Sequence, residues 1–136
     1  MSEARICFTL RQFQELQNVQ PELREILEDA LNHWPGDTME ITCIYRTQEE
    51  EEAAGGKTGV HRTTPHRAVD LRVKNLGLNF QGKADAVAEV LNDLWSYDPS
   101  PSPSRTNLKV AVSKLHGSGP HVHVQVHPKT QRRVMF

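Results

Sequence analysis

Residues 121–127 read H-V-H-V-Q-V-H. Such strict alternation of polar and apolar residues is typical of a β-strand with one face in the core. The valines at positions 122, 124 and 126 therefore take the core face. The polar side chains of His121, His123, Gln125 and His127 then project from the opposite face. This strand is expected to present several imidazoles side by side.

The remaining strands follow from similar patterns. Residues 66–73 read H-R-A-V-D-L-R-V, which predicts a half-buried strand with Val69, Leu71 and Val73 in the core and His66, Ala68, Asp70 and Arg72 on a polar face. Leu108, Val110 and Val112 predict another strand with these three residues on one face, joined to residues 121–127 by a turn at 117–120. Residues 39–46, M-E-I-T-C-I-Y-R, are rich in β-branched residues and predict one more strand.

Helical spacing of apolar residues appears in three segments. Residues 21–34 and 83–95 carry apolar residues at intervals of three and four, and residues 8–16 favour a short helix. The glutamate-rich stretch 47–60 favours a helical turn followed by a flexible loop, and 99–104 an exposed connection. We therefore expect an α+β fold with two or three helices beside a small, mainly antiparallel sheet.

Size and charge narrow the classes of function. The chain has 136 residues, which predicts a single domain spanning 1–136, and its formal net charge is -1. This balance argues against nucleic acid as a partner, and no apolar run is long enough for a membrane span. The amino terminus lacks a signal-peptide pattern, so we expect cytoplasmic synthesis. We also expect a monomer.

Two cysteines, Cys7 and Cys43, are too widely separated to suggest a metal or disulfide motif, and we expect both thiols to be buried. A cysteine peptidase built from Cys43 and a histidine is an alternative function. An apolar position in the middle of a strand is typical of an inert thiol, however, and argues against that alternative.

Six of the seven histidines follow residue 60, and they suggest a metal site. Catalytic zinc usually takes three protein ligands and leaves a fourth position for water. Asp70 supplies an acid on a polar strand face, and His123 lies on the polar face of another strand. His61 can loop back as the third ligand. We therefore predict a Zn²⁺ site of His61, Asp70 and His123, with His66 as the rival to His61.

Three stretches, taken in order, resemble the zinc D-Ala-D-Ala carboxypeptidase and L-alanyl-D-glutamate endolysin family. They are I-Y-R-T-Q-E-E-E at 44–51, V-H at 60–61 followed by R-A-V-D-L at 67–71, and G-P-H-V-H-V-Q-V at 119–126. The resemblance implies the hedgehog/DD-peptidase fold. It also implies a zinc peptidase that cleaves peptide bonds in peptidoglycan stem peptides.

The resemblance also assigns roles. Arg46 matches an arginine that approaches the substrate, and His121 matches a residue beside the reaction centre that stabilises the tetrahedral intermediate or carries a proton. Many members have an acid that acts as general base where this chain has Pro120, so His121 or another residue that the sequence does not identify would take that role. Eight residues separate His61 from Asp70, where the family usually has six.

The same features leave a second class of function open. A non-catalytic module that binds metal or cell wall would keep the fold without hydrolysing peptides, and Pro120 favours it. For the enzyme, synthesis without a leader would fit release to the cell wall or incorporation in a phage particle.

Overall fold

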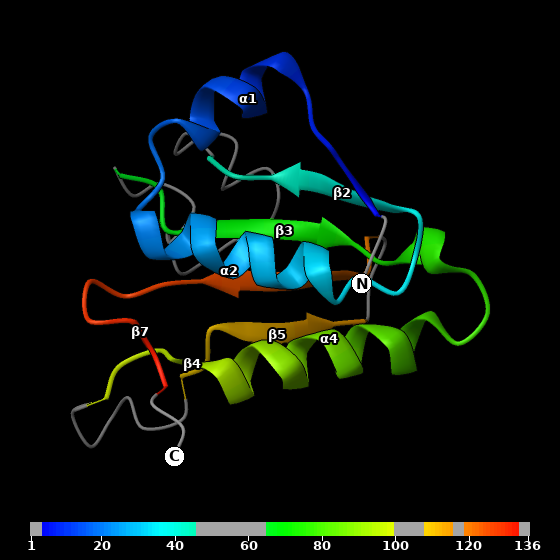
Figure 1. Cartoon of the computed structure of the whole chain (residues 1–136). Coiled ribbons are helices and arrows are strands. Elements are labelled where there is room, and N and C mark those ends of the chain that lie inside the picture. The colour runs from blue at the N-terminus through cyan, green and yellow to red at the C-terminus, as the bar shows by residue number, and fades with distance from the viewer. Residues whose placement is uncertain (1–3, 46–64, 100–107, 116–118, 134–136) are drawn as a thin grey trace.

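The four expected strands assemble with one strand that was not expected, β1, into a five-stranded sheet (Figure 1). The computed structural model describes residues 4–45, 65–99, 108–115 and 119–133. The strands are β1 Arg5–Cys7, β2 Thr38–Cys43, β3 Ala68–Arg72, β5 Ala111–Lys114 and β6 His121–Gln125. They lie in the order β1, β2, β3, β6, β5. Only the pair β1 and β2 is parallel within this sheet, so the prediction of a mainly antiparallel sheet is confirmed.

Three α-helices accompany the sheet in the described part of the chain, as expected. They are α1 Leu10–Leu16, α2 Pro21–Asn32 and α4 Phe80–Leu94. A single 3₁₀ turn, η2 Lys74–Leu76, follows β3, and the short strands β4 Trp95–Ser96 and β7 Gln131–Arg132 form a separate antiparallel pair. The coarse α+β class is thus correct.

Local chemistry explains where the first two helices begin. The Thr9 hydroxyl accepts a hydrogen bond from the Gln12 backbone N–H, while the Gln12 side chain accepts one from the Thr9 N–H. This reciprocal capping satisfies two N–H groups that have no partner inside the helix. Pro21 occupies the first turn of α2, where its missing N–H costs nothing.

Helix α4 begins at Phe80, three residues before the predicted segment 83–95. Gly82 lies within its first turn, where a Cβ atom would be 2.8 Å from Oδ1 of Asn79. Gly82 therefore permits a close approach. At the other end, Trp95 belongs to β4, and its indole N–H donates to Asp29 of α2 at 2.8 Å.

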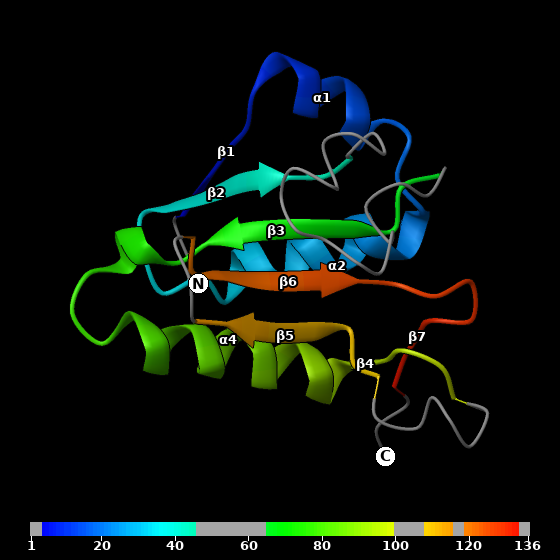
Figure 2. The same ribbon diagram turned by 180° about the vertical axis from the view of Figure 1, so that it is seen from behind.

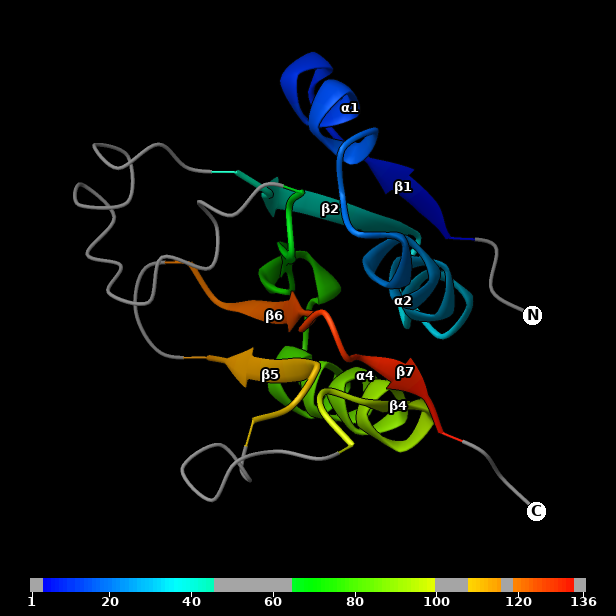
Figure 3. The same ribbon diagram turned by 90° about the vertical axis from the view of Figure 1, so that its left-hand side faces the viewer.

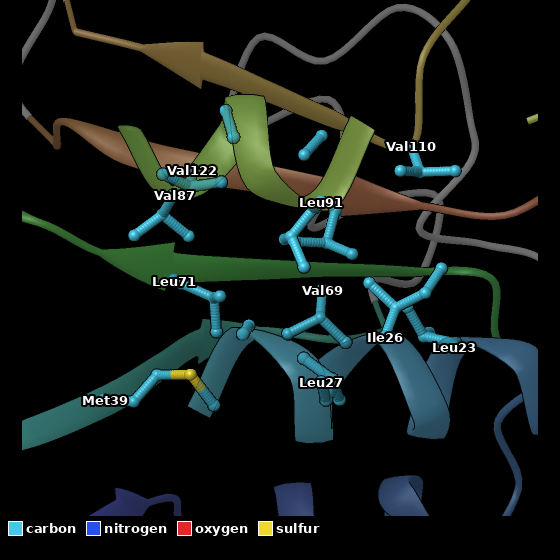
Figure 4. Close-up of a cluster of buried hydrophobic side chains, with 14 of the residues drawn as sticks. Leu23, Ile26, Leu27, Met39, Val69, Leu71, Val87, Leu91, Val110 and Val122 are labelled. Carbon is cyan, nitrogen blue, oxygen red and sulfur yellow. The ribbon is translucent and has the colours of Figure 1, made fainter. Parts of the chain in front are cut away.

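Helices α2 and α4 cover one face of the sheet, as the edge-on view shows (Figure 3). Their apolar stripes meet the inward-facing strand residues in a single core (Figure 4). The largest fully buried side chains include Leu23, Ile26, Met39, Leu71, Leu91, Val122 and Val124. The valines of 121–127 thus take the core face, as predicted.

The opposite face of the sheet is seen in Figure 2, and it is less exposed than expected around β3. This strand was predicted to be half-buried, but Ala68 and Asp70 on its polar face are also buried, with exposed fractions of 0% and 3%. The reason is its place in the middle of the sheet, between β2 and β6. Asp70 is therefore a buried carboxylate.

The face predicted for β5 is partly wrong. Val110 is buried, but Leu108 and Val112 are exposed. Val112 pairs with His123, and Ala111 pairs with Val124, so Val112 shares the polar face of β6 while Ala111 faces the core. Alanine gave no apolar signal strong enough to set the alternation of this short strand.

At the outer edge of the sheet, β5 is held by a side chain of α4. The Asn92 amide donates to the Ala111 carbonyl at 2.8 Å and accepts from the Ala111 N–H at 3.1 Å. These two hydrogen bonds are those that a neighbouring strand would make.

Cys7 is exposed and Cys43 is partly buried, so the expectation of two buried thiols is wrong for Cys7. It lies on an edge strand of three residues, in which only Ile6 is partly buried. No helix in the described residues has the length and apolar character needed to cross a bilayer.

Replacing Leu91 with alanine should lower the free energy of unfolding by about 2–5 kcal/mol, because the side chain is fully buried between α4 and the sheet. Urea denaturation measures this change. Leu78→Ala is the matched control, since Leu78 is 94% exposed and its truncation should have little effect. Equal effects of the two substitutions would contradict this view of the core.

Candidate metal centre

The polar face of the sheet brings Asp70 and two histidines together. Asp70 in β3 is the direct cross-strand partner of His123 in β6, and His121 lies two residues earlier on β6. Residues that pair directly across antiparallel strands project on the same face. The side chains of Asp70 and His123 are 5% and 8% exposed, while that of His121 is 25% exposed. The group is therefore buried on one side and accessible at His121.

Both imidazoles face the same carboxylate oxygen. Nδ1 of His123 is 2.8 Å from Oδ1 of Asp70, and Nε2 of His121 is 3.6 Å from the same atom. One potential ligand atom from each residue lies within 4.8 Å of the others. These three residues could hold a metal ion.

A backbone carbonyl determines which nitrogen of His121 carries a proton. Nδ1 of His121 is 2.7 Å from the Gly119 carbonyl oxygen. A carbonyl only accepts hydrogen bonds, so Nδ1 is the donor. In the neutral imidazole, Nε2 then bears the lone pair, and this is the nitrogen that faces Asp70.

The Gln125 side chain and the Lys109 backbone carbonyl together orient the ring of His123. The Gln125 amide nitrogen donates to the Lys109 carbonyl at 3.0 Å, which turns its Oε1 toward Nε2 of His123 at 3.1 Å. Nε2 of His123 therefore faces an acceptor, while its Nδ1 forms a hydrogen bond with Oδ1 of Asp70 at 2.8 Å. With a metal ion on Nδ1, Nε2 would keep its hydrogen bond to Gln125. Metal-binding histidines are commonly oriented by such bonds from the other ring nitrogen.

The three side chains converge on one small volume. Nε2 of His121, Nδ1 of His123 and Oδ1 of Asp70 point toward it, and a metal ion there would replace the hydrogen bond between His123 and Asp70. Ligand atoms of tetrahedral zinc at about 2.0–2.1 Å are about 3.3 Å apart. The two measured separations of 2.8 and 3.6 Å bracket that value. The donor set fits a small divalent metal ion.

The structure brings together only part of the predicted zinc site. Asp70 and His123 meet as expected, and His121, predicted as a catalytic neighbour, joins them as a possible ligand. His61 and Arg46, the predicted third ligand and substrate arginine, lie outside the described residues. Their roles stay predictions.

His66, the rival to His61, lies before β3 rather than in it. Its backbone bridges to Val19, and its buried ring packs against Tyr45 with centroids 4.9 Å apart. It does not belong to the group that Asp70 forms among the described residues. His127 also departs from the polar face: it lies beyond the end of β6 and packs against Tyr97.

Gln125 and the Gly119 carbonyl are the contributors that the sequence did not identify. Gln125 was expected on the polar face, and its spacing of two from His123 was the signal available. The Gly119 carbonyl had no signal, because every residue carries a carbonyl. Cys43 ends β2 and pairs with Asp70 across the sheet, at an irregularity in the register.

The chain matches no protein-family model, no curated protein and no solved structure.

Gln125→Leu should lower the affinity for a divalent metal about 10- to 100-fold, because the substitution removes the acceptor that fixes the His123 ring. Competition with a chromophoric chelator measures the affinity, and ¹⁵N shifts of His123 in the metal-loaded protein report the loss of the hydrogen bond at Nε2. Gln125→Glu retains an acceptor and should preserve that hydrogen bond. Gln81→Leu, on the exposed face of α4, is the matched control. Unchanged shifts in Gln125→Leu would refute this role of Gln125.

Proposed function

We propose that this protein is a zinc-dependent peptidase that cleaves peptide bonds in the stem peptides of peptidoglycan. The observation that carries the proposal is the buried Asp70 carboxylate facing two imidazole nitrogens, with each ring held by a hydrogen bond at its far side. Nε2 of His121 faces Asp70 at 3.6 Å, beyond hydrogen-bond distance, and a bound cation would bridge that separation.

Zinc is the metal that this ligand chemistry favours. Two imidazoles and one carboxylate form the N₂O set that is common in catalytic zinc sites. The Gly119 carbonyl and the Gln125 amide orient the rings before any metal binds, which lowers the cost of assembling the site. The negative charge of Asp70 offsets part of the charge of a divalent cation.

Peptide hydrolysis is the chemistry that fits such a centre. Zinc with three protein ligands supplies a water of lowered pKa and polarises a carbonyl group. The exposure of His121 leaves an approach for a substrate from the open side, whereas Asp70 and His123 are shielded. The peptidoglycan substrate is supported by the three ordered stretches that resemble the zinc D-Ala-D-Ala carboxypeptidase and L-alanyl-D-glutamate endolysin family.

The third ligand distinguishes two versions of the proposal. The geometry favours His121, whose Nε2 faces Asp70. The resemblance instead favours His61 as the ligand and leaves His121 to carry a proton or stabilise the tetrahedral intermediate. In either version, Asp70 and His123 bind the metal.

Purified protein should contain about one zinc per chain, and Asp70→Asn and His123→Ala should lose both the metal and peptidoglycan cleavage. Metal analysis and digestion of purified peptidoglycan, with identification of the new termini, measure the two properties. Asp85→Asn, an exposed carboxylate on α4, is the control for the charge change. Full cleavage by zinc-free His123→Ala would rule the mechanism out.

His121→Ala and His61→Ala separate the two ligand sets. If His121 is the third ligand, its removal should weaken zinc binding at least about tenfold, while His61→Ala binds normally. The opposite pattern would assign the ligand to His61 and a catalytic role to His121. His33→Ala, at an exposed position after α2, should change neither property.

A non-catalytic module that binds metal or cell wall is the second candidate. Its support is Pro120, which stands where an acid acts as general base in many of the enzymes resembled. Within the described residues, the metal-capable group includes Asp70 as its one carboxylate. A protein that binds zinc but does not cleave peptidoglycan or D-amino-acid peptides would favour this module.

A further inference from the structure

A row of charged side chains crosses the sheet beside the candidate metal centre. Arg72 in β3 pairs directly with His121 in β6, and Lys114 in β5 pairs with His121 from the other side. Direct cross-strand partners share a face, so both cations project on the same face as the imidazole. The row continues into β2, where Glu40 lies 3.6 Å from Nε of Arg72.

These cations are close to the site and open to solvent. Direct cross-strand partners have Cα atoms about 4.5–5.5 Å apart, and alternate residues on one strand about 6–7 Å apart. Arg72 is therefore a near neighbour of both His121 and Asp70. Its side chain is 51% exposed, and Lys114 is exposed as well.

The two rows of the polar face differ in charge. The row of Asp70, His123 and Val112 holds two of the three candidate ligands, Asp70 and His123, and both are buried. The row of Arg72, His121 and Lys114 is more exposed and carries two cations. A substrate that contacts His121 would therefore lie beside residues that carry a guanidinium and an ammonium group.

We propose that Arg72 and Lys114 form a carboxylate-binding subsite beside the metal centre, so that the preferred substrates are peptides with a free carboxylate near the scissile bond. This inference rests on the proposed peptidase function. The planar guanidinium suits paired hydrogen bonds to a carboxylate, and Lys114 adds a mobile positive charge on the other side of His121. Glu40 competes with the substrate for Arg72 and lowers the affinity of the subsite.

Binding of small probes to the zinc-loaded protein tests the subsite without requiring turnover. The probes are N-acetyl-D-alanine, its C-terminal amide, and N-acetyl-D-glutamate amidated at its main-chain carboxyl, each titrated by NMR. Arg72→Gln with Lys114→Gln should weaken binding of a carboxylate probe about fivefold and leave the fully amidated probe unchanged. Glu40→Gln should strengthen carboxylate binding about twofold.

The probe that loses affinity identifies the carboxylate: N-acetyl-D-alanine reports a terminal group, and the glutamate probe a side-chain group. Arg24→Gln with Lys129→Gln makes the same change in net charge on α2 and in the turn after β6, away from this row, and should leave all titrations unaltered.

Equal carboxylate affinity in the wild type and the Arg72/Lys114 variant would overturn the subsite, even if zinc binding and peptidoglycan cleavage persist. Loss of zinc from the wild type would instead refute the proposed function. The same titrations on metal-free protein then still report whether Arg72 and Lys114 bind carboxylates.

Discussion

The site depends on a buried negative charge in the middle strand of the sheet. A carboxylate that is removed from water needs a compensating cation or several hydrogen bonds, because its desolvation is costly. Asp70 accepts a hydrogen bond from Nδ1 of His123 in β6, and the position of β6 next to β3 is what makes that contact possible. Strand order, register and ring orientation thus all contribute to the stability of one ionised group.

The sequence was most informative where apolar alternation was strong. The three valines of 121–127 correctly placed His121, His123 and Gln125 on one face, and β3 correctly placed Asp70 opposite the core residues. The sequence did not reveal that β3 lies at the centre of the sheet, because strand order depends on contacts between distant segments. For the same reason it gave no warning that Asp70 is buried.

The alternation of polar and apolar residues could not predict the contacts that orient the two histidine rings. The distinction between His121 as a neighbour and as a possible ligand depends on separations of under an ångström, which a period of two residues does not determine. The carbonyls of Gly119 and Lys109 orient the rings directly or through Gln125, and a main-chain carbonyl carries no signature in the sequence. In β5, a run of small and β-branched residues supported either register, and Val112 took the polar face.

The amide of Asn92 has a consequence for assembly as well as for folding. An edge strand offers unpaired N–H and C=O groups on which another chain can add a strand. Because Asn92 occupies both groups of Ala111, an incoming strand would have to displace a side chain before it could pair there. The side of α4 beside β5 carries three acidic residues, Asp85, Glu89 and Asp93. Their negative charges would repel an incoming acidic strand. At Ala111, the edge nearest the candidate centre is therefore shielded from strand addition by one asparagine.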